Sequence, residues 1–251
     1  MKSSKYKALI VDVDGTLIPY TRNAVPSPKV TEAINRASKI LHTGIATSRC
    51  YYASQHIIKH LNLSGPSILN GGAQIVDLST LEHYYQQSLE QTDIFYISKV
   101  LKDYRLPFIL CDGVNADILF DGKNFPEKTF FIYSQGLENT LAQKLVKTIS
   151  HRPTISTFTT KSEILGKTDF LVTHARATKQ HGIEEAAKAL GISTKEIIAV
   201  GDGYNDFPLL MACGLKVAMG NAVYDLKAIA DYIAPTVEED GVADVIEKFI
   251  L

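Results

Sequence analysis

Short apolar runs that end abruptly in acidic residues constrain the fold of this chain more than any other feature of its sequence. Residues 8–11 are apolar without alternation and stop at Asp12, and residues 197–200 lead in the same way into Gly201 and Asp202. Runs of this kind are typical of strands that are buried on both faces of a parallel sheet. Helical segments separate the runs, so the sequence predicts an α/β fold with a Rossmann-like, doubly wound parallel sheet.

The segment after the first strand shows the expected order of elements. Ser27 can cap a helix that begins at Pro28, and apolar residues follow at helical spacing as far as Gly44, the expected helix stop. Short strands are expected at residues 45–47 and 67–69, with a helix between them. This alternation of strands and helices supports the doubly wound sheet.

The middle of the chain has a different pattern. Between residues 88 and 167, a helix followed by paired strands occurs twice. This order predicts a small α+β domain with an antiparallel sheet, inserted between two halves of the parallel one. We therefore expect a core made of residues 1–87 and 168–251, and an inserted cap made of residues 88–167.

Composition and charge exclude several classes of partner. The net charge is −1, so no overall field attracts nucleic acid or an anionic membrane. Asp12 and Asp14 interrupt the first apolar run too early for a secretory or membrane-spanning segment. The cysteines Cys50, Cys111 and Cys213 lack the spacing of a disulfide framework or a zinc site. We expect a cytoplasmic monomer or homodimer with no nucleic-acid or membrane partner.

Polar residues directly follow four of the predicted strands. In an open α/β sheet the ligand binds outside the carboxyl ends of the strands, so these residues are the candidates for chemistry. They are Asp12 to Thr16, Thr47 to Arg49, Asn70 to Gly72 and Gly201 to Asp206.

Four aspartates, Asp12, Asp14, Asp202 and Asp206, are expected to converge at this edge of the sheet. Two carboxylates about 4 Å apart repel each other by roughly 1–4 kcal/mol, so such a group needs a cation. Oxygen ligands without histidine or cysteine favour a hard ion, and a site completed by water and phosphate favours Mg²⁺. An ordinary turn also explains Asp-x-Asp-Gly, but the second acidic cluster at another strand end favours the metal site.

The same residues carry a family resemblance. Asp-Val-Asp-Gly-Thr-Leu at residues 12–17 resembles the first motif of the haloacid dehalogenase superfamily. Thr47, Lys179 at a helix start and residues 201–206 resemble the second, third and fourth motifs, in the same chain order.

Two further stretches, residues 217–222 and 239–243, resemble the Cof-like, type IIB branch of this superfamily. In that branch a mobile α+β cap of type C2B is inserted between the second and third motifs. The resemblance therefore implies the same insertion that the order of helices and strands predicts.

The resemblance implies a role for each matching residue. Asp12 is the nucleophile that forms an aspartyl-phosphate, which divides one difficult displacement into two easier ones. Asp14 protonates the leaving oxygen and later activates water. Thr47 binds the transferring phosphoryl group, and Lys179 neutralises its charge and bridges to Asp12.

The resemblance also implies the ligands of a Mg²⁺ ion and of the substrate. The metal ligands are Asp12, Asp14 through its backbone carbonyl, Asp202, and Asp206 in direct or indirect contact. The substrate-binding residues are Thr47, Ser48, Arg49, Lys179 and Asn205.

Two positions depart from the pattern of the branch. Ser48 stands where glycine is usual in the second motif, and Lys179 is followed by Gln180 rather than by glycine. Neither change removes a catalytic group. The second leaves Lys167 as a competing candidate for the third-motif lysine.

A Mg²⁺-dependent phosphohydrolase acting on a small phosphomonoester, such as a sugar phosphate or a phosphoglycolate-like compound, is the function that the resemblance implies. A phosphomutase of the phosphomannomutase type is an alternative, because it resembles this core and cap. A sugar-phosphate sensor without turnover is a second alternative.

In the cap, ordinary turn chemistry explains the polar residues Asp112, Asn115, Asp117 and Asp121, although a turn facing the core would help to select the substrate.

Overall fold

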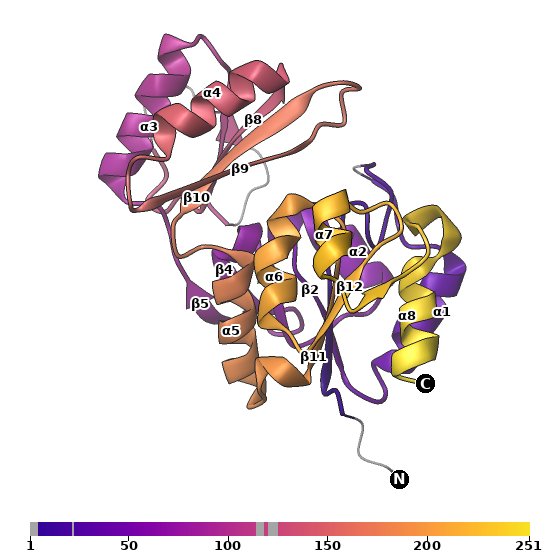
Figure 1. Cartoon of the computed structure of the whole chain (residues 1–251). Helices are drawn as coiled ribbons and strands as arrows, with labels where there is room; N and C mark the ends of the chain where they lie inside the picture. The colour runs from indigo at the N-terminus through magenta and orange to yellow at the C-terminus, as the bar shows by residue number, and fades with distance from the viewer. Residues whose placement is uncertain (1–4, 22, 114–117, 120–124) are drawn as a thin grey trace.

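The computed structural model describes residues 5–21, 23–113, 118–119 and 125–251. These residues form a core and a second, smaller body above it (Figure 1). Asn115, Asp117 and Asp121 of the predicted cap turn lie outside the described residues. None of the helices in the described part of the chain has the length and apolar character needed to cross a bilayer.

The core is built on a five-stranded parallel sheet with the order β13-β12-β11-β1-β2. Its strands are β1 (Ala8–Val11), β2 (His42–Ile45), β11 (Ile197–Gly201), β12 (Leu215–Ala218) and β13 (Tyr232–Ile233). The chain winds outward in one direction from β1 and in the other direction from β11. The strand order therefore reverses between these two neighbours, where an α/β sheet binds its ligand.

A three-stranded antiparallel sheet lies beside β2. It contains β3 (Pro66–Leu69), β4 (Gln74–Asp77) and β5 (His83–Gln86). A single parallel bridge between Ala46 and Ile68 joins β3 to the end of β2. The predicted strand at residues 67–69 is confirmed, and it connects the parallel sheet to the antiparallel strands β4 and β5.

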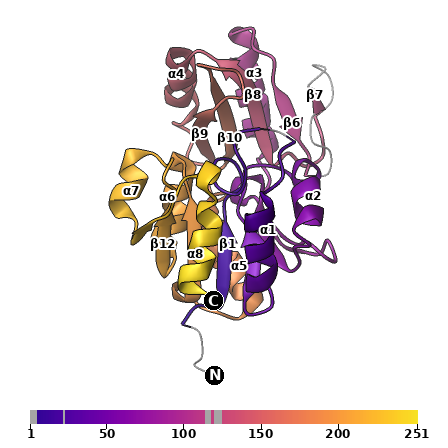
Figure 2. The same cartoon turned by 90° about the vertical axis from the view of Figure 1, so that its right-hand side faces the viewer.

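Helices cover both faces of the core sheet. They are α1 (Pro28–Ala37), α2 (Tyr51–His60), α5 (Lys179–Leu190), α6 (Phe207–Ala212), α7 (Tyr224–Ile229) and α8 (Gly241–Phe249). Helices α1 and α8 pack together on one face, and α5 lies with α6 on the other (Figure 2).

Local signals in the sequence predicted the start of α1 but not its end. The Ser27 side chain accepts a hydrogen bond from the Val30 amide, as expected for an N-cap before Pro28. The prediction that Gly44 ends this helix is wrong. The helix ends at Ala37, and Gly44 lies inside β2, where a Cβ atom would come within 2.9 Å of the Pro66 carbonyl oxygen.

The second body contains a five-stranded sheet and two helices. The sheet has the order β7-β6-β8-β10-β9, and its described pairs are antiparallel. Its elements are β6 (Ile109–Cys111), β7 (Ile118–Leu119), β8 (Phe131–Leu137), β9 (Ile155–Lys161), β10 (Thr168–His174), α3 (Gln91–Asp103) and α4 (Asn139–Ile149). A buried apolar cluster that includes Phe170 and Ile132 joins this sheet to the helices. The prediction of an inserted α+β cap on a Rossmann-like core is confirmed.

The expected boundary at Lys167 needs correction. Strand β10 begins at Thr168 and pairs with β8 and β9, so it belongs to the cap sheet. Residues 87–90 and 175–178, which connect the two bodies, contain no helix or strand. We propose that the cap extends from about residue 88 to His174.

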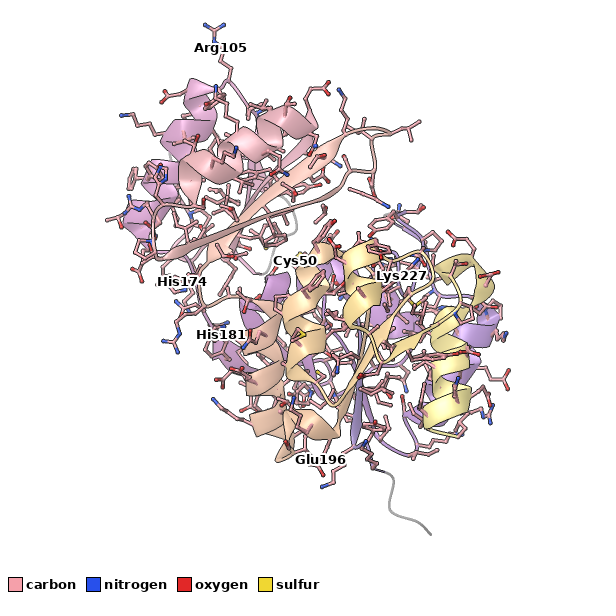
Figure 3. The ribbon with its side chains drawn as sticks, in the orientation of Figure 1. Cys50, Arg105, His174, His181, Glu196 and Lys227 are labelled. Atoms are coloured by element: carbon pink, nitrogen blue, oxygen red, sulfur yellow. The ribbon has the colours of Figure 1, made fainter. Side chains whose placement is uncertain are left out.

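Cap and core meet at the carboxyl end of the parallel sheet. Figure 3 shows Cys50 and His174 near this junction and Glu196 at the opposite end of the core. Cys50 of the core and Cys111 and Phe131 of the cap form a small buried cluster across the junction. The cap sheet therefore covers the residues that follow β1 and β2.

Candidate active site

Asp12 and Asp202 lie side by side because the strands before them are neighbours. Val11 of β1 is in register with Val200 of β11, and the Asp12 amide donates to the Val200 carbonyl at 2.9 Å. Both aspartates are less than a tenth exposed. The sheet thus brings two acidic groups, 190 positions apart in the numbering, to one point.

Lys179 supplies a positive charge beside these aspartates. It is the first residue of α5, and its Nζ donates to Asp12 Oδ1 at 2.6 Å and to Asp206 Oδ1 at 2.5 Å. Burial alone would lower the pKa of Lys179, but the carboxylates of Asp12 and Asp206 raise it above its usual value. The ammonium group therefore stays charged inside the core. The competing Lys167 lies on the cap and pairs with Glu138.

Asp206 is held by three donors. Besides Lys179, the backbone amides of Asp202 and Gly203 donate to its Oδ2 at 3.0 and 2.9 Å. The side chain is fully buried. Its carboxylate therefore fixes the loop after β11 and the position of the lysine.

Asp202 accepts hydrogen bonds from two residues of the loop that follows β1. Thr16 Oγ1 donates to its Oδ1 at 3.0 Å, and the Tyr20 hydroxyl donates to its Oδ2 at 2.6 Å. Gly15 makes this approach possible, because its φ is +80° and a Cβ atom would lie 2.3 Å from Asp202 Oδ2. Thr16 was among the strand-end candidates at residues 12–16, but no role was predicted for it, and Tyr20 was not predicted at all. Thr16 lies within the first motif, but nothing in the sequence marked Tyr20.

The carboxylates are more numerous than the cation can balance. Burial, followed by the charge of Asp206, raises the pKa of Asp12 well above its usual value, although Lys179 opposes this effect. The same two causes raise the pKa of Asp202 to about 6. A further positive charge at this point would stabilise the ionised carboxylates.

Three of the predicted metal ligands form a compact group. One carboxylate oxygen each from Asp12, Asp202 and Asp206 lies within 4.8 Å of the others. This all-oxygen set suits a hard divalent cation. The carboxylate of Asp14 is not part of the group.

Asp14 instead forms a two-point ion pair with Arg49. Arg49 Nε donates to Asp14 Oδ2 at 2.9 Å, and a terminal guanidinium nitrogen donates to Asp14 Oδ1 at 2.5 Å. Both residues were predicted to lie in the site, but their pairing was not predicted. It joins the loop after β1 to the loop after β2.

The remaining candidates also lie at this edge. Thr47 is buried, and its Oγ1 accepts a hydrogen bond from the Arg49 amide at 3.0 Å. The Ser48 hydroxyl is buried and has no hydrogen-bond partner among the described residues. Asn205 lies on the turn after β11, within the short 3₁₀ helix η3 (Tyr204–Asp206).

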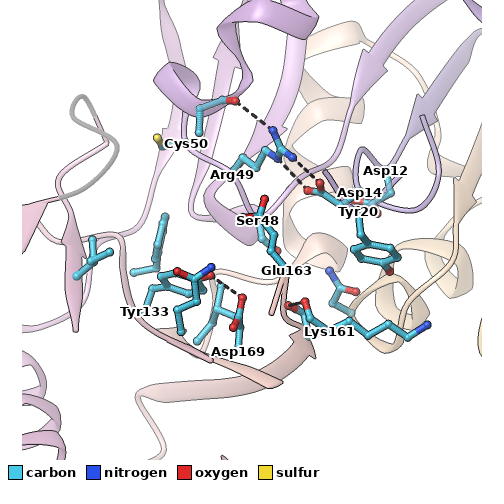
Figure 4. A pocket seen from close by; sticks show the side chains of 17 residues that line it. Asp12, Asp14, Tyr20, Ser48, Arg49, Cys50, Tyr133, Lys161, Glu163 and Asp169 are labelled. Carbon is cyan, nitrogen blue, oxygen red and sulfur yellow. Dashed lines mark hydrogen bonds and ion pairs between the residues drawn. The ribbon is translucent and has the colours of Figure 1, made fainter. Parts of the chain in front are cut away.

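A cavity of about 230 Å³ lies between this edge and the cap. From the core it is lined by Asp12, Asp14, Tyr20, Ser48, Arg49 and Asn205, among others. From the cap it is lined by strands β6, β8, β9 and β10 and by Glu163 (Figure 4). A small molecule in this cavity would touch both bodies.

Comparison with known proteins agrees with this geometry. A sequence model of the haloacid dehalogenase-like hydrolases matches residues 9–138 and 121–246. A Bacillus subtilis protein named 5-amino-6-(5-phospho-D-ribitylamino)uracil phosphatase YcsE is 27% identical, with 98% of this chain and 96% of the relative covered. A phosphoglycolate phosphatase of Methanobrevibacter smithii is 26% identical, with 97% of this chain and 98% of the relative covered.

A similar solved structure supports the fold. The subclass IIB sugar phosphatase BT4131 superposes with a TM-score of 0.78 at 23% identity, with 97% of this chain and 98% of the other covered. The fold, the matched family and the phosphatases among the relatives agree with the Cof-like resemblance of the motifs. The chain therefore belongs to the haloacid dehalogenase-like hydrolases, as a phosphoric monoester hydrolase of that family.

Proposed function

We propose that the chain cleaves a small phosphomonoester with the help of Mg²⁺, through an aspartyl-phosphate formed on Asp12. The observation that carries this proposal is the buried group of Asp12, Asp202, Asp206 and Lys179, of which Asp12 lines the cavity. A nucleophile, a fixed cation and an acidic metal site are the parts that phosphoryl transfer requires.

Asp12 and Lys179 act together in the first step. Lys179 holds one oxygen of the Asp12 carboxylate, which orients the group for attack on phosphorus from the cavity. The attack forms the bond between the carboxylate and phosphorus, and the bond from phosphorus to the alcohol breaks. The same ammonium group then lies beside the charge that develops on the phosphoryl oxygens.

Asp14 supplies and removes protons. It lines the cavity two residues after Asp12 and can donate a proton to the departing alkoxide. In the second step, it accepts a proton from the water that cleaves the aspartyl-phosphate. Arg49 fixes the orientation of this carboxyl group through two hydrogen bonds.

Three uncharged side chains are proposed to bind the phosphoryl group. The buried Ser48 hydroxyl has no partner among the described residues, so a phosphoryl oxygen would satisfy it. Thr47 and Asn205 offer a hydroxyl and an amide at the same edge. Ser48 thus replaces the usual glycine with a hydrogen-bond donor.

The donor set fits Mg²⁺. Asp12 and Asp202 would hold the ion, together with the Asp14 carbonyl, and Asp206 would support it indirectly because three donors already occupy its oxygens. When bound, Mg²⁺ neutralises charge on the transferring group and offsets repulsion among the carboxylates. The Tyr20 and Thr16 hydroxyls orient Asp202 for this purpose.

The relatives support two classes of substrate. One is named for a phosphorylated ribityl compound, and another for phosphoglycolate. A sugar phosphate or a phosphoglycolate-like compound is therefore the proposed substrate class.

Phosphate release from a panel of phosphomonoesters tests the proposal. Wild type, Asp12→Asn and the control Asp231→Asn, which changes a surface carboxylate of the core, are compared with Mg²⁺ and with chelator. We expect release that requires both Asp12 and Mg²⁺, and unchanged activity in the control. Release that persists in Asp12→Asn would contradict the role of the nucleophile. No release from any ester without a bisphosphorylated sugar would favour a mutase.

A further inference from the structure

The cap sheet presents a defined face to the cavity. Along β8, Phe131, Tyr133 and Gln135 line the cavity, whereas Ile132 is buried toward α3 and α4. Asp169 and Leu171 of β10 line the cavity in the same way. Alternate side chains of antiparallel strands therefore form the wall opposite Asp12.

An irregularity in the sheet shapes this face. The register between β8 and β10 shifts between Thr168 and Phe170, where the segment from Ser134 to Leu137 carries one extra residue. Gly136 has a φ of +72°, and its amide donates to Asp169 Oδ1 at 2.8 Å. Bulges of this kind redirect side chains near active sites. Here the Gly136 amide of the bulge holds the Asp169 carboxylate.

Asp169 is a buried carboxylate without a cationic partner among the described residues. It is 4% exposed, and it accepts hydrogen bonds from the Gly136 amide and, at 2.5 Å, from the Tyr133 hydroxyl. Figure 4 shows Tyr133 and Asp169 joined in this way on the cavity wall. Because the Tyr133 hydrogen is directed to Asp169, both groups can offer only acceptor lone pairs to a ligand.

The other described charged residues that line the cavity do not offset the negative charge of Asp169. Glu163 adds a second carboxylate on the cap side, and Lys161 lies with its Nζ 5.7 Å from the centre of the Tyr20 ring. Arg49 is paired with both oxygens of Asp14. Among the described residues, the cap side of the cavity is therefore rich in acceptors and carries more negative than positive charge.

We propose that this cap face selects phosphomonoesters whose alcohol is uncharged or cationic and rich in hydroxyl or amino groups, with Asp169 as the specificity-determining residue. Hydroxyl and ammonium groups donate to the acceptors of Asp169, Tyr133 and Gln135. A carboxylate or second phosphate on the alcohol meets like charge in a partly desolvated site, which is unfavourable. The inference rests on the proposed phosphatase function and favours sugar or amino-sugar phosphates over phosphoglycolate-like acids.

Three six-carbon esters provide a matched test. Glucose 6-phosphate, glucosamine 6-phosphate and 6-phosphogluconate present hydroxyl, ammonium and carboxylate groups at the end away from the phosphate. We expect wild type to have a kcat/KM at least about tenfold lower for 6-phosphogluconate than for the other two. Equal or higher kcat/KM for 6-phosphogluconate would overturn the inference. No release from any phosphomonoester would instead overturn the phosphatase proposal.

Asp169→Asn is the diagnostic variant. Asparagine retains an acceptor for the Gly136 amide and removes the negative charge. We expect the ratio of kcat/KM for 6-phosphogluconate to that for glucose 6-phosphate to rise by about tenfold. The control Glu138→Gln removes a cap carboxylate outside the cavity and should leave the ratio unchanged. An unchanged ratio in Asp169→Asn would exclude Asp169 as the determinant.

Inhibition of the wild-type enzyme gives an answer that does not depend on the folding of a variant. Glucosamine and gluconate are tested as inhibitors of aryl phosphate hydrolysis. We expect glucosamine to inhibit at concentrations at least about tenfold lower than gluconate. Stronger inhibition by gluconate would overturn the proposed selectivity.

Discussion

Core and cap contribute to the cavity in different ways. The core supplies Asp12 and Asp202 from the ends of neighbouring parallel strands, and Lys179 from the start of α5 bonds to Asp12. The cap supplies alternate side chains from the face of an antiparallel sheet, such as Tyr133 and Asp169. The groups proposed to carry the chemistry are thus held mainly by buried ion pairs, whereas those proposed to contact the leaving alcohol lie on a sheet face.

This difference separates the residues proposed for the chemistry from those proposed to select the substrate. A change on the cap face alters contacts with the alcohol and leaves the aspartate cluster in place. A change in the core cluster alters charge balance, metal affinity and stability together. Substitutions in the two regions should therefore give different combinations of effects.

Removing the buried cation should give the largest effect. We expect Lys179→Met to lower kcat by about 10³-fold for every ester, because the developing charge loses its fixed partner. Without Mg²⁺, the free energy of unfolding should fall by about 3 kcal/mol, because the carboxylates that Lys179 bridges lose their counter-charge.

Lys167→Met is the matched control for this experiment. Lys167 lies on the cap with Glu138, so the substitution should change stability by less than about 0.5 kcal/mol and leave kcat unchanged. Steady-state kinetics and urea denaturation measure both quantities. A larger loss of kcat in the Lys167 variant would transfer the catalytic role to that lysine.

A substitution that leaves a cavity in the cap core should affect the cap more than the catalytic core. Phe170 is fully buried between the cap sheet and its helices, so Phe170→Ala should destabilise the cap by about 3–5 kcal/mol. Turnover of a small aryl phosphate should change less than turnover of the preferred ester, because the core cluster is intact. Phe95→Ala, at an exposed position of α3, is the control. Equal losses for both esters would mean that the cap supports the chemistry itself.

The sequence predicted the core well because its signals are local. An apolar strand followed by an aspartate identified Asp12 and Asp202, and Ser27 marked the start of α1. Motif order then brought Lys179 to the same site. Gly44 was misread because glycine ends helices and also permits close approach in strands, and only the neighbouring Pro66 carbonyl distinguishes the two cases.

The cap was harder to predict because its face depends on pairing between strands. Strand β8 was not predicted from the sequence, although its residues alternate between the two faces of the sheet. The bulge that directs Asp169 depends on the register between β8 and β10. The contact of Tyr20 with Asp202 likewise spans 182 positions and has no local signal.

A substitution at Gly72, which packs against the segment that joins the cap to α5, should have a smaller effect on stability and activity. Gly72 has a φ of +107°, and a Cβ atom there would lie 2.1 Å from the Thr178 carbonyl oxygen, next to Lys179. We expect Gly72→Ala to lower stability by about 2 kcal/mol and kcat/KM by about tenfold, because the start of α5 must move. Gly191→Ala, at the other end of α5, has no atom within 4 Å and should lower stability alone. Unchanged kcat in Gly72→Ala would show that the lysine tolerates this movement.

The smallest expected effect is a pH dependence of core stability. Burial, opposed by a hydrogen bond to the Pro66 carbonyl and the charge of Asp77, lowers the pKa of His42 below 6.5. At His42, the unfolded chain therefore binds a proton more readily than the folded one. The contribution of His42 to the free energy of unfolding is complete above pH 6.5 and is lost as the pH falls toward the pKa of the folded state. His42→Gln should flatten this part of the stability curve, measured by urea denaturation between pH 5 and about 7.5. An unaltered curve would assign the pH dependence to other groups, with the buried carboxylates at the active site as the first to test.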